Sequence, residues 1–551
     1  MDFPMHLNTI LTRLVQNIQK MRVSDIWFYG ILAGFAALAC FIMIYDMAWG
    51  PWAFSDSAAY IVAARNLVAG NGLSIPTPDG SLSPLRLHQP LYPLVMSFFL
   101  LFDIHPFTTT TVLNVASFSL SILLIGYGCY YFSKSKMFSI VMVFLMTWCP
   151  YVIENYDGAM SEPLYLFLTL LNFMAVLLFL EKRKNWVLIC AALTAGLSIL
   201  TRYIGIVNVV GGALMIFFFL QEKTKNRAYT AFFYSFLAAL LPVVWIFFSG
   251  TTSGIGNRQI IFPQNLPTIF GNFYQAIVIP FADWLPLQKV WQITDEIRFL
   301  MIGLMGAFCS ISIAIALWLK SQKKHTEWDG FDRLIFGSVI ICLMYVLIFF
   351  ATFAFSSLPP DINSRTLIPL FPFFLMVFYG IFFHFPRTHF EKIVSASIIL
   401  SIFLVSFLVW YPTTRELLYD RHHNGHGYTS KYYQESTILK AARTLPRDIP
   451  WISNEPAFLL LYLDKFPYDL NSIYPAITKP DATSLGNGYT DLDRIFKQDE
   501  AALLILQPQL ENDLRKLIGD QAATQIKKLT SGLKVHDQSF DGMIFFYPEE
   551  N

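Results

Sequence analysis

Long apolar segments alternate with short polar connections over about three quarters of the chain. A helix needs roughly 20 apolar residues to cross a bilayer, and only helices or closed barrels satisfy their backbone groups there. About eleven segments meet this criterion, although several are short or divided by a polar residue. We therefore predict membrane helices at 26–45, 107–132, 137–153, 161–180, 186–200, 203–220, 228–249, 297–319, 331–355, 364–385 and 391–411.

Three connections are too long or too patterned to be plain linkers. Residues 56–67 have helical amphipathic periodicity, which predicts a helix lying along the membrane interface. Residues 91–102 are apolar but short for a span, so we expect them to lie flat or to re-enter. The connection 251–296 contains four prolines in its middle, and loops of this length are usually functional.

From residue 412 onward the pattern is that of an ordinary globular domain. Short apolar runs predict buried strands at 451–453, 502–506 and 543–547, with helices at 511–517 and 522–529. The expected fold class is therefore a membrane all-α domain followed by a small α/β domain. We divide the chain into an N-terminal cytoplasmic segment, a polytopic membrane domain and the α/β domain, at 1–25, 26–411 and 412–551.

Lysine and arginine are concentrated in alternate connections, which predicts the orientation of the spans. Connections on the same side as the N-terminus carry clusters such as Lys182, Arg183 and Lys184, whereas the other connections are nearly free of positive charge. Positive loops stay in the cytoplasm, so an odd number of spans places the α/β domain outside. The chain has no Asn-X-Ser/Thr sequon, which favours a prokaryotic cytoplasmic membrane.

Composition supports this class of protein and argues against others. Of the 551 residues 55% are hydrophobic and 14% are charged, with a mean hydropathy of +0.49. A formal net charge of +1 makes nucleic acid an unlikely partner, because binding to a phosphate backbone requires clustered cations. The six cysteines all lie in apolar segments and form neither a disulfide framework nor a metal motif.

Almost no ionisable residue lies in the middle of a predicted span. Charges at the bilayer centre mark ion pathways and transport sites, so their absence argues against a pump or channel. Two non-enzymatic alternatives stay open at this stage. One is a transporter or flippase of lipid-linked saccharides, and the other is a membrane scaffold that displays the C-terminal domain.

The acidic residues gather where spans meet the outer water. Asp56 begins the amphipathic segment, where partial desolvation suits a general base, but an aspartate before a helix is more often an N-cap. Glu154, Asp157 and Glu162 cluster in the second outer loop. They form a candidate acceptor-binding or cation-binding group, although a solvated loop and helix start explain the first two more simply.

Arginines occupy the same outer level. Arg202 interrupts two apolar runs, Arg365 precedes the tenth span, and Arg258 lies in the long connection. A guanidinium fork fits phosphate, so together they are candidates to bind a lipid-borne phosphate, with snorkelling to headgroups as the alternative. His88 has no His or Cys at ligand spacing, which favours a hydrogen-bonding residue over a metal ligand.

Together these motifs resemble the C-type membrane glycosyltransferase superfamily, in particular the branch of protein O-mannosyltransferases and lipid A aminoarabinose transferases. The resemblance rests on motifs in sequence order: Asp56-Ser-Ala-Ala-Tyr60 with Ala64, Arg65, Leu67, Gly70 and Gly72; His88-Gln-Pro-Leu-Tyr-Pro93; Ser161-Glu162-Pro163-Leu164; Thr201-Arg202; and Arg365 with Pro369 and Pro372. It covers the membrane part of the chain.

The resemblance implies inverting transfer of a sugar from a polyprenyl-phosphate carrier to a hydroxyl of a glycan, lipid or protein. Asp56 matches the family's first-loop acid and would be the base, and Glu162 matches the second-loop acid and would orient the acceptor or a cation. Arg202 and Arg365 would offset charge on the departing phosphate. Ser57 stands where the family often has a second acid, so the requirement for a divalent cation stays open, as does the acceptor.

Overall fold

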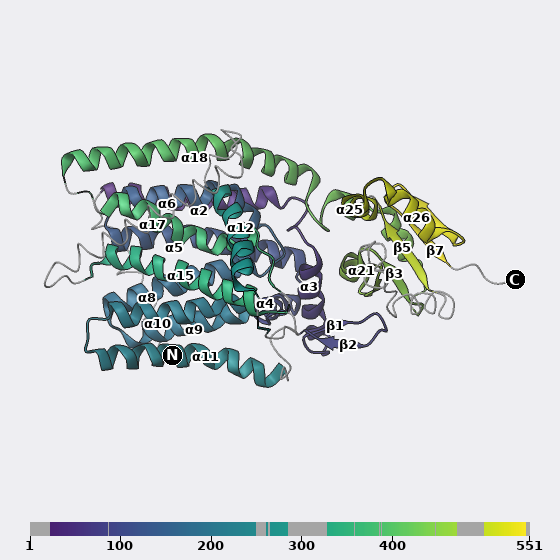
Figure 1. Cartoon of the computed structure of the whole chain (residues 1–551), viewed down its shortest axis with the longest axis horizontal. Coiled ribbons are helices and arrows are strands. Elements are labelled where there is room, and N and C mark those ends of the chain that lie inside the picture. The colour runs from purple at the N-terminus through teal and green to yellow at the C-terminus, as the bar shows by residue number, and fades with distance from the viewer. Residues whose placement is uncertain are drawn as a thin grey trace, which may run out of the picture.

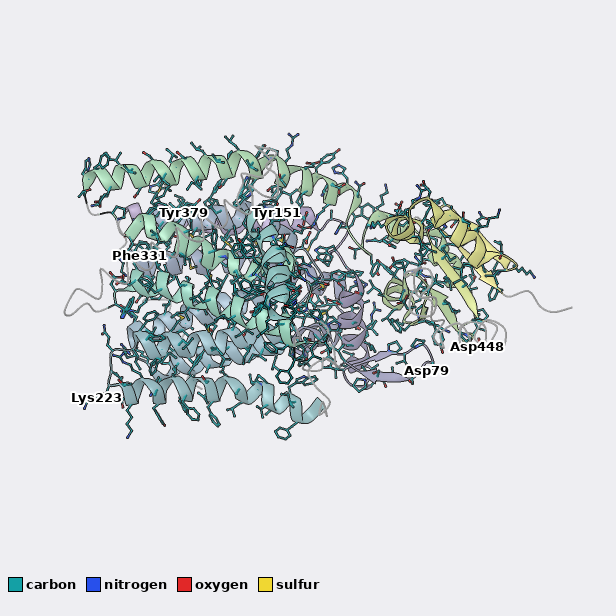
Figure 2. The ribbon with its side chains drawn as sticks, in the orientation of Figure 1. Asp79, Tyr151, Lys223, Phe331, Tyr379 and Asp448 are labelled. Atoms are coloured by element: carbon teal, nitrogen blue, oxygen red, sulfur yellow. The ribbon has the colours of Figure 1, made fainter. Side chains whose placement is uncertain are left out.

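The computed structural model describes residues 23–85, 88–249, 261–262, 265–284, 328–357, 359–384, 386, 388–446, 448–470, 501–507 and 509–546. Two parts are evident in Figure 1: a bundle of long helices and, beyond one end of it, a smaller domain with a β-sheet. We call the end of the bundle beside this domain the tail end, and the smaller domain the tail domain. In Figure 2, Asp79 and Asp448 lie near the tail domain, whereas Lys223 and Phe331 lie at the opposite end of the bundle.

The described part of the chain has seven helices long and apolar enough to cross a membrane, or eight if the bent pair α6 (Lys136–Trp148) and α7 (Pro150–Tyr156) is one span. The seven are α2 (Val23–Asp46), α5 (Pro106–Ser133), α8 (Glu162–Lys182), α11 (Thr224–Ser249), α15 (Gly330–Phe355), the stretch from α16 (Ser364–Leu367) through η3 (Ile368–Leu370) to α17 (Phe371–His384), and α18 (His389–Asn424).

Eight of the eleven predicted spans coincide with these helices, with the bent pair counted as one. Two more of them are shorter apolar helices, α9 (Asn185–Thr201) and α10 (Ile206–Phe219). The predicted span 297–319 lies outside the described residues. Within the long connection 251–296, the described part contains α12 (Leu266–Trp284).

Small residues let the bundle helices pack closely, as is usual where lipid provides no hydrophobic driving force. A side chain at Gly128 of α5 would collide with Met174 of α8, and one at Gly126 would collide with Leu32 of α2. Helices that are far apart in the sequence therefore pack together in one continuous core. That core fixes the ends of α8, α9 and α16 relative to one another, and the candidate site is built from these ends.

The first connection forms a compact layer at the tail end. It contains α3 (Ser55–Val68), the hairpin of β1 (Ser74–Pro76) and β2 (Leu82–Pro84), and α4 (Leu91–Leu100). The predicted helix at 56–67 is confirmed, but residues 57–64 are all buried. The reason is that α3 packs between α4 and α21 (Pro456–Leu463) of the tail domain instead of presenting one face to lipid headgroups.

The tail domain contains a five-stranded mixed sheet in the order β4-β3-β5-β7-β6. Its strands are β3 (Trp451–Ser453), β4 (Tyr468–Asp469), β5 (Ala502–Leu506), β6 (Lys534–Ser539) and β7 (Gly542–Phe546). Its helices are α19 (Lys431–Gln434), α20 (Thr437–Ala442), α21 (Pro456–Leu463), α25 (Gln509–Ile518), the turn η4 (Gly519–Gln521) and α26 (Ala522–Thr530). The predicted strands and helices are confirmed. Strand β5 is a continuous apolar run because it is buried on both faces.

The last bundle helix continues well beyond the predicted domain boundary at residue 412. Pro412 lies inside α18, which ends only at Asn424, where Gly425 with a φ of 67° terminates it. His422 therefore belongs to this helix. Its ring stacks on that of Tyr45, with centroids 3.9 Å apart. A helix this long carries the chain directly from the bundle into the tail domain.

Candidate active site

Three of the predicted site residues, Glu162, Arg202 and Arg365, make contact at the tail end of the bundle although they come from separate elements. A fourth, Asp56, is linked to them through His88 and Tyr60. Asp56 lies in the first turn of α3, Glu162 begins α8, Arg202 follows α9, and Arg365 lies in α16. His88 precedes α4 and lies beside Asp56. Helix ends supply most of these positions, so charged groups reach polar surroundings while the helix bodies remain apolar.

Glu162 is the centre of an ion cluster. Its Oε1 lies 2.5 Å from Nη1 of Arg202 and 3.4 Å from Nε of Arg365. The carboxylate side chain is 2% exposed, whereas the two arginine side chains are 25% and 27% exposed. A buried carboxylate is tolerated only with such partners. Two guanidinium groups around one carboxylate leave a net positive charge on the accessible side.

The backbone around Arg202 explains its position. Arg202 ends α9 in an extended conformation, with φ −151° and ψ 140°, and the short turn η1 (Tyr203–Gly205) then leads into α10. Gly205 packs so closely on the backbone of Ser198 that a Cβ there would collide with it. After this turn the arginine side chain reaches Glu162, with its Nη1 2.5 Å from Glu162 Oε1. Snorkelling to headgroups therefore does not describe this residue.

Arg365 is held by a short, well-capped helix. Asn363 and Thr366 form reciprocal capping hydrogen bonds, with Thr366 N donating to Asn363 Oδ1 at 3.0 Å. Asn155 Nδ2 donates to the carbonyl oxygen of Arg365 at 3.4 Å. The guanidinium carbon lies 4.9 Å from the ring centre of Phe54, a cation–π contact.

Asp56 is not an N-cap. Phe54 occupies that position, and its backbone N–H donates to Ser57 Oγ at 3.2 Å. The Asp56 carboxylate is 32% exposed, and its Oδ1 lies 3.9 Å from His88 Nε2. In the first turn of a helix a carboxylate is favoured by the macrodipole. The capping alternative is thus excluded, and the carboxylate remains accessible.

His88 and Tyr60 connect Asp56 to the ion cluster. Burial lowers the pKa of His88, although nearby Asp56 acts to raise it, so the imidazole is neutral at neutral pH. The Tyr60 ring lies 4.9 Å from that of His88, and its hydroxyl lies 3.2 Å from Oγ of Ser161, the neighbour of Glu162. Burial raises the pKa of Tyr60, which keeps its hydroxyl protonated and able to donate.

Asp157 does not join Glu162. It forms a second ion cluster in which Arg421 of α18 pairs with Asp157 Oδ2, with Glu154 Oε1 at 3.0 Å and with Asp46 Oδ2 at 3.9 Å. Arg421, Asp46 and Asp157 are nearly fully buried. Arg421 was not identified from the sequence, because a single arginine near the end of a helix carries no pattern that reveals its partners.

Arg65 also lies outside the ion cluster. It joins α3 to the tail domain, donating from Nη1 to Asp464 Oδ1 at 2.8 Å and to the carbonyl of Leu461 at 3.1 Å. Its side chain therefore ties two parts of the fold together. Arg258, the third predicted phosphate-binding arginine, lies outside the described residues.

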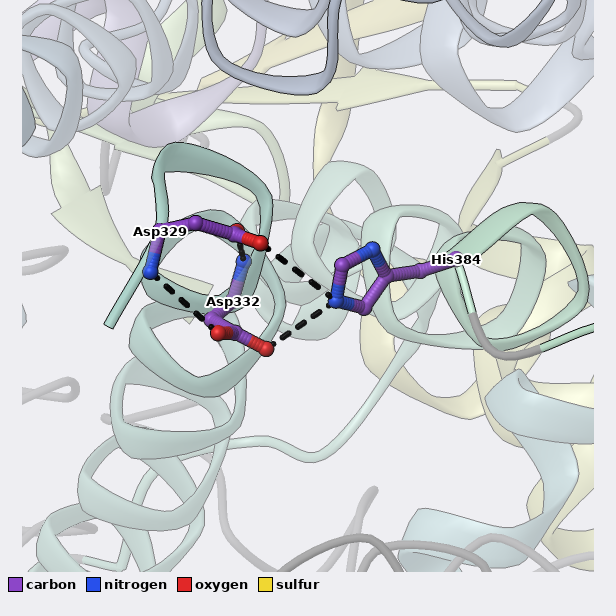
Figure 3. Close-up of side chains that lie close together, drawn as sticks. All are labelled: Asp329, Asp332 and His384. Atoms are coloured by element: carbon purple, nitrogen blue, oxygen red, sulfur yellow. Dashed lines mark hydrogen bonds and ion pairs between the residues drawn. The ribbon is translucent and has the colours of Figure 1, made fainter. Parts of the chain in front are cut away.

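One group of potential metal ligands occurs among the described residues, and it is remote from Asp56. Ligand atoms of Asp329, Asp332 and His384 all lie within 4.8 Å of one another (Figure 3). Asp329 and Asp332 form a capping box at the start of α15, and His384 Nε2 lies 3.0 Å from Asp332 Oδ1. Helix capping accounts for the two carboxylates, and the group lies near Phe331 at the end opposite the tail domain.

Comparison with known proteins identifies similar structures but no similar sequences. No protein-family model and no curated protein sequence matches the chain. The structure is similar to ArnT from Cupriavidus metallidurans in the apo state, with 9% identity, a TM-score of 0.55 and coverage of 94% of this chain and 98% of that chain. The undecaprenyl phosphate-bound form of ArnT matches with 9% identity, the same coverage and a TM-score of 0.53.

The mycobacterial arabinofuranosyltransferase AftD also matches, at 12% identity and a TM-score of 0.51, over 94% of this chain and 41% of that chain. Both proteins are polytopic C-type glycosyltransferases, so the resemblance inferred from sequence motifs is confirmed at the level of the fold.

Proposed function

We propose, from the fold that this chain shares with polytopic membrane glycosyltransferases, that it transfers a sugar from a polyprenyl-phosphate donor to a hydroxyl acceptor. The acceptor is a glycan, lipid or protein, and the reaction takes place at the outer face of a prokaryotic cytoplasmic membrane. The undecaprenyl phosphate bound to ArnT supports a lipid-phosphate donor of this class.

The observation that carries the proposal is the ratio of charges around Glu162. Two arginines share this single buried carboxylate, and each remains about one quarter exposed, at 25% and 27%. The cluster therefore has one uncompensated positive charge next to the accessible surface. A phosphate oxygen is the ligand that a guanidinium fork binds best, and a departing lipid phosphate gains negative charge as its bond to the sugar breaks.

The acceptor side of the reaction is assigned to Asp56. Its carboxylate accepts the proton of the acceptor hydroxyl, whose oxygen then forms a bond to the anomeric carbon from the face opposite the lipid phosphate. The bond between that carbon and the phosphate oxygen breaks, and the electron pair leaves with the lipid phosphate, so configuration is inverted. Arg202 and Arg365 stabilise the charge that develops on the leaving phosphate.

The remaining predicted residues support these two groups. Glu162 holds the arginines in place, a role that its burial favours over direct contact with acceptor or cation. Neutral His88 orients the acceptor beside Asp56, and the buried Tyr60 ring supports the His88 ring. Asp157 and Arg65 have structural partners, and Arg258 stays a prediction. No step here depends on a divalent cation.

The experiment is sugar transfer by the purified chain in lipid nanodiscs with radiolabelled polyprenyl-phosphate sugars and a membrane extract as acceptor. Asp56→Asn keeps the shape of the side chain but removes its basicity, and we expect label transfer to fall about 10²- to 10⁴-fold. Asp103→Asn is the matched control, because Asp103 is exposed and lies at the end of α4. Transfer that is equal in wild type and Asp56→Asn would exclude Asp56 as the base.

A further inference from the structure

The segment just before Asp56 is held between two other parts of the chain. On one side, Trp52 pairs with Gly158, with Trp52 N donating to Asp157 O at 3.2 Å and Ala159 N donating to Trp52 O at 2.7 Å. On the other side, Ala53 pairs with Gly427 at the start of the tail domain, and Tyr428 N donates to Ala53 O at 2.7 Å. The tail domain thus makes backbone contact three residues before Asp56.

Glycine is required for both approaches. A Cβ at Gly158 would lie 2.8 to 3.1 Å from atoms of the Trp52 ring. A Cβ at Gly427 would collide with the carbonyl oxygen of Ala53, and its φ of +60° is unfavourable for other residues. The segment 52–54 therefore has little freedom to move relative to the second loop or the tail domain.

This segment positions a stack of side chains that ends on the ion cluster. The His426 ring meets that of Trp52 edge-on at 5.8 Å, and Trp52 stacks on Phe54 at 4.8 Å with an interplanar angle of 11°. Arg365 lies over the Phe54 ring with its guanidinium carbon 4.9 Å from the centroid. The series leads from the tail domain to an arginine that the proposed function assigns to the donor phosphate.

The contact matters because Arg365 is loosely held by Glu162. Its Nε lies 3.4 Å from Glu162 Oε1, is buried, and makes no hydrogen bond in the described structure. Arg202, by comparison, lies 2.5 Å from the same oxygen. The ring face of Phe54 therefore supplies a constraint on the Arg365 guanidinium that the carboxylate does not.

We propose that Phe54 is a positioning residue for Arg365. The tail domain contributes to the donor-phosphate site through Gly427 and the Trp52–Phe54 stack. This inference rests on the proposed function for its effect on turnover, but not for its effect on phosphate binding. The intact donor carries less charge on its phosphate than the product does. Misplacing Arg365 therefore lowers kcat and the affinity for free undecaprenyl phosphate more than it raises the KM for donor.

The test is a double-mutant cycle on the full chain in nanodiscs, with Phe54→Leu, Arg365→Gln and the double variant. We expect Phe54→Leu to lower kcat and undecaprenyl phosphate affinity about three- to tenfold, which is the range of a partly desolvated cation–π contact. In the Arg365→Gln background the same substitution has no further effect. Phe54→Tyr, which keeps the ring face, restores most of the loss. Equal losses from Phe54→Leu in both backgrounds would overturn the positioning role.

The contribution of the tail domain to the donor-phosphate site is tested by comparing Gly427→Ala with Gly532→Ala. Gly532 has a φ of +83° and open space around its Cβ position, so it controls for backbone strain without a collision. Gly427→Ala lowers undecaprenyl phosphate affinity as Phe54→Leu does, and Gly532→Ala does not. Affinity unchanged in a folded Gly427→Ala protein would disprove the involvement of the tail domain.

The two proposals fail in different ways. If wild-type protein binds undecaprenyl phosphate but transfers no sugar from any donor, the proposed function fails, and the binding cycle still decides the role of Phe54. If wild-type protein transfers sugar and Phe54→Leu matches it in kcat and in undecaprenyl phosphate affinity, the positioning role fails and the proposed function stands.

Discussion

Two ion clusters at the tail end of the bundle use the same chemical groups in opposite proportions. Around Glu162 two arginines share one carboxylate, and both arginines are partly exposed. Around Arg421 three carboxylates share one arginine, and most of the cluster is sealed from solvent. The first arrangement has spare positive charge and access for a ligand, as a binding site needs. The second has neither, and it joins α18 to α2 and α7 as a structural connection.

The largest expected effect is on folding, from Arg421→Met. Removing the only arginine leaves Asp46 and Asp157 buried without a partner, which destabilises a protein by about 3–5 kcal/mol. Thermal unfolding in nanodiscs measures this loss. Arg415→Met, an exposed change on the same helix, is the control. Adding Asp157→Asn to Arg421→Met should recover part of the stability, and no recovery would argue against charge burial as the cause.

The next effect is on catalysis, from Arg202→Gln. Loss of one preorganised donor to a developing anion lowers kcat about 10²- to 10³-fold. Glu162 keeps Arg365 as a partner, so we expect a smaller loss of stability than from Arg421→Met. Arg415→Gln is the matched control for transfer activity. If Arg202→Gln unfolds the protein as readily as Arg421→Met, the two clusters do not differ in the way proposed.

A smaller effect concerns the pH dependence of stability at His88. Burial lowers its pKa in the folded protein from 6.5, so the unfolded chain binds more protons just below pH 6.5. The contribution of neutral His88 is present above that pH and is lost as pH falls through the folded pKa. His88→Gln should therefore flatten the acid side of the stability profile below pH 6.5. If the wild type and His88→Gln gave the same stability profile, the burial of a neutral imidazole would be contradicted.

The smallest effect is expected at Arg65, whose ion pair with Asp464 is exposed by 32% on one side and 64% on the other. Exposed pairs contribute about 0–1 kcal/mol and are screened by salt. Arg65→Gln should lower the melting temperature slightly at low salt, with transfer activity retained. A large loss of activity at normal stability would place Arg65 in the site after all.

Several elements were predictable because their signal is local. The length of the apolar run in α5 or α8, and the short continuous run of β5, depend only on neighbouring residues, and these elements appear where the sequence predicts them. The boundary at residue 412 shows the limit of local signals. The change to a globular composition there suggested the end of the membrane domain, but α18 continues through Pro412 to Asn424.

By itself, the sequence determined the membrane class and three of the five tail-domain strands. It also singled out Asp56, Glu162, Arg202 and Arg365 as candidates, since charges kept at span ends are visible in one dimension. Only the tertiary structure decided which charges meet. Glu154 and Arg421 are 267 residues apart, and Arg65 and Asp464 are 399 apart, so no spacing rule connects them. A charge pairs with whichever opposite charge the helix packing brings near, and that packing separated the cluster around Glu162 from the cluster around Arg421.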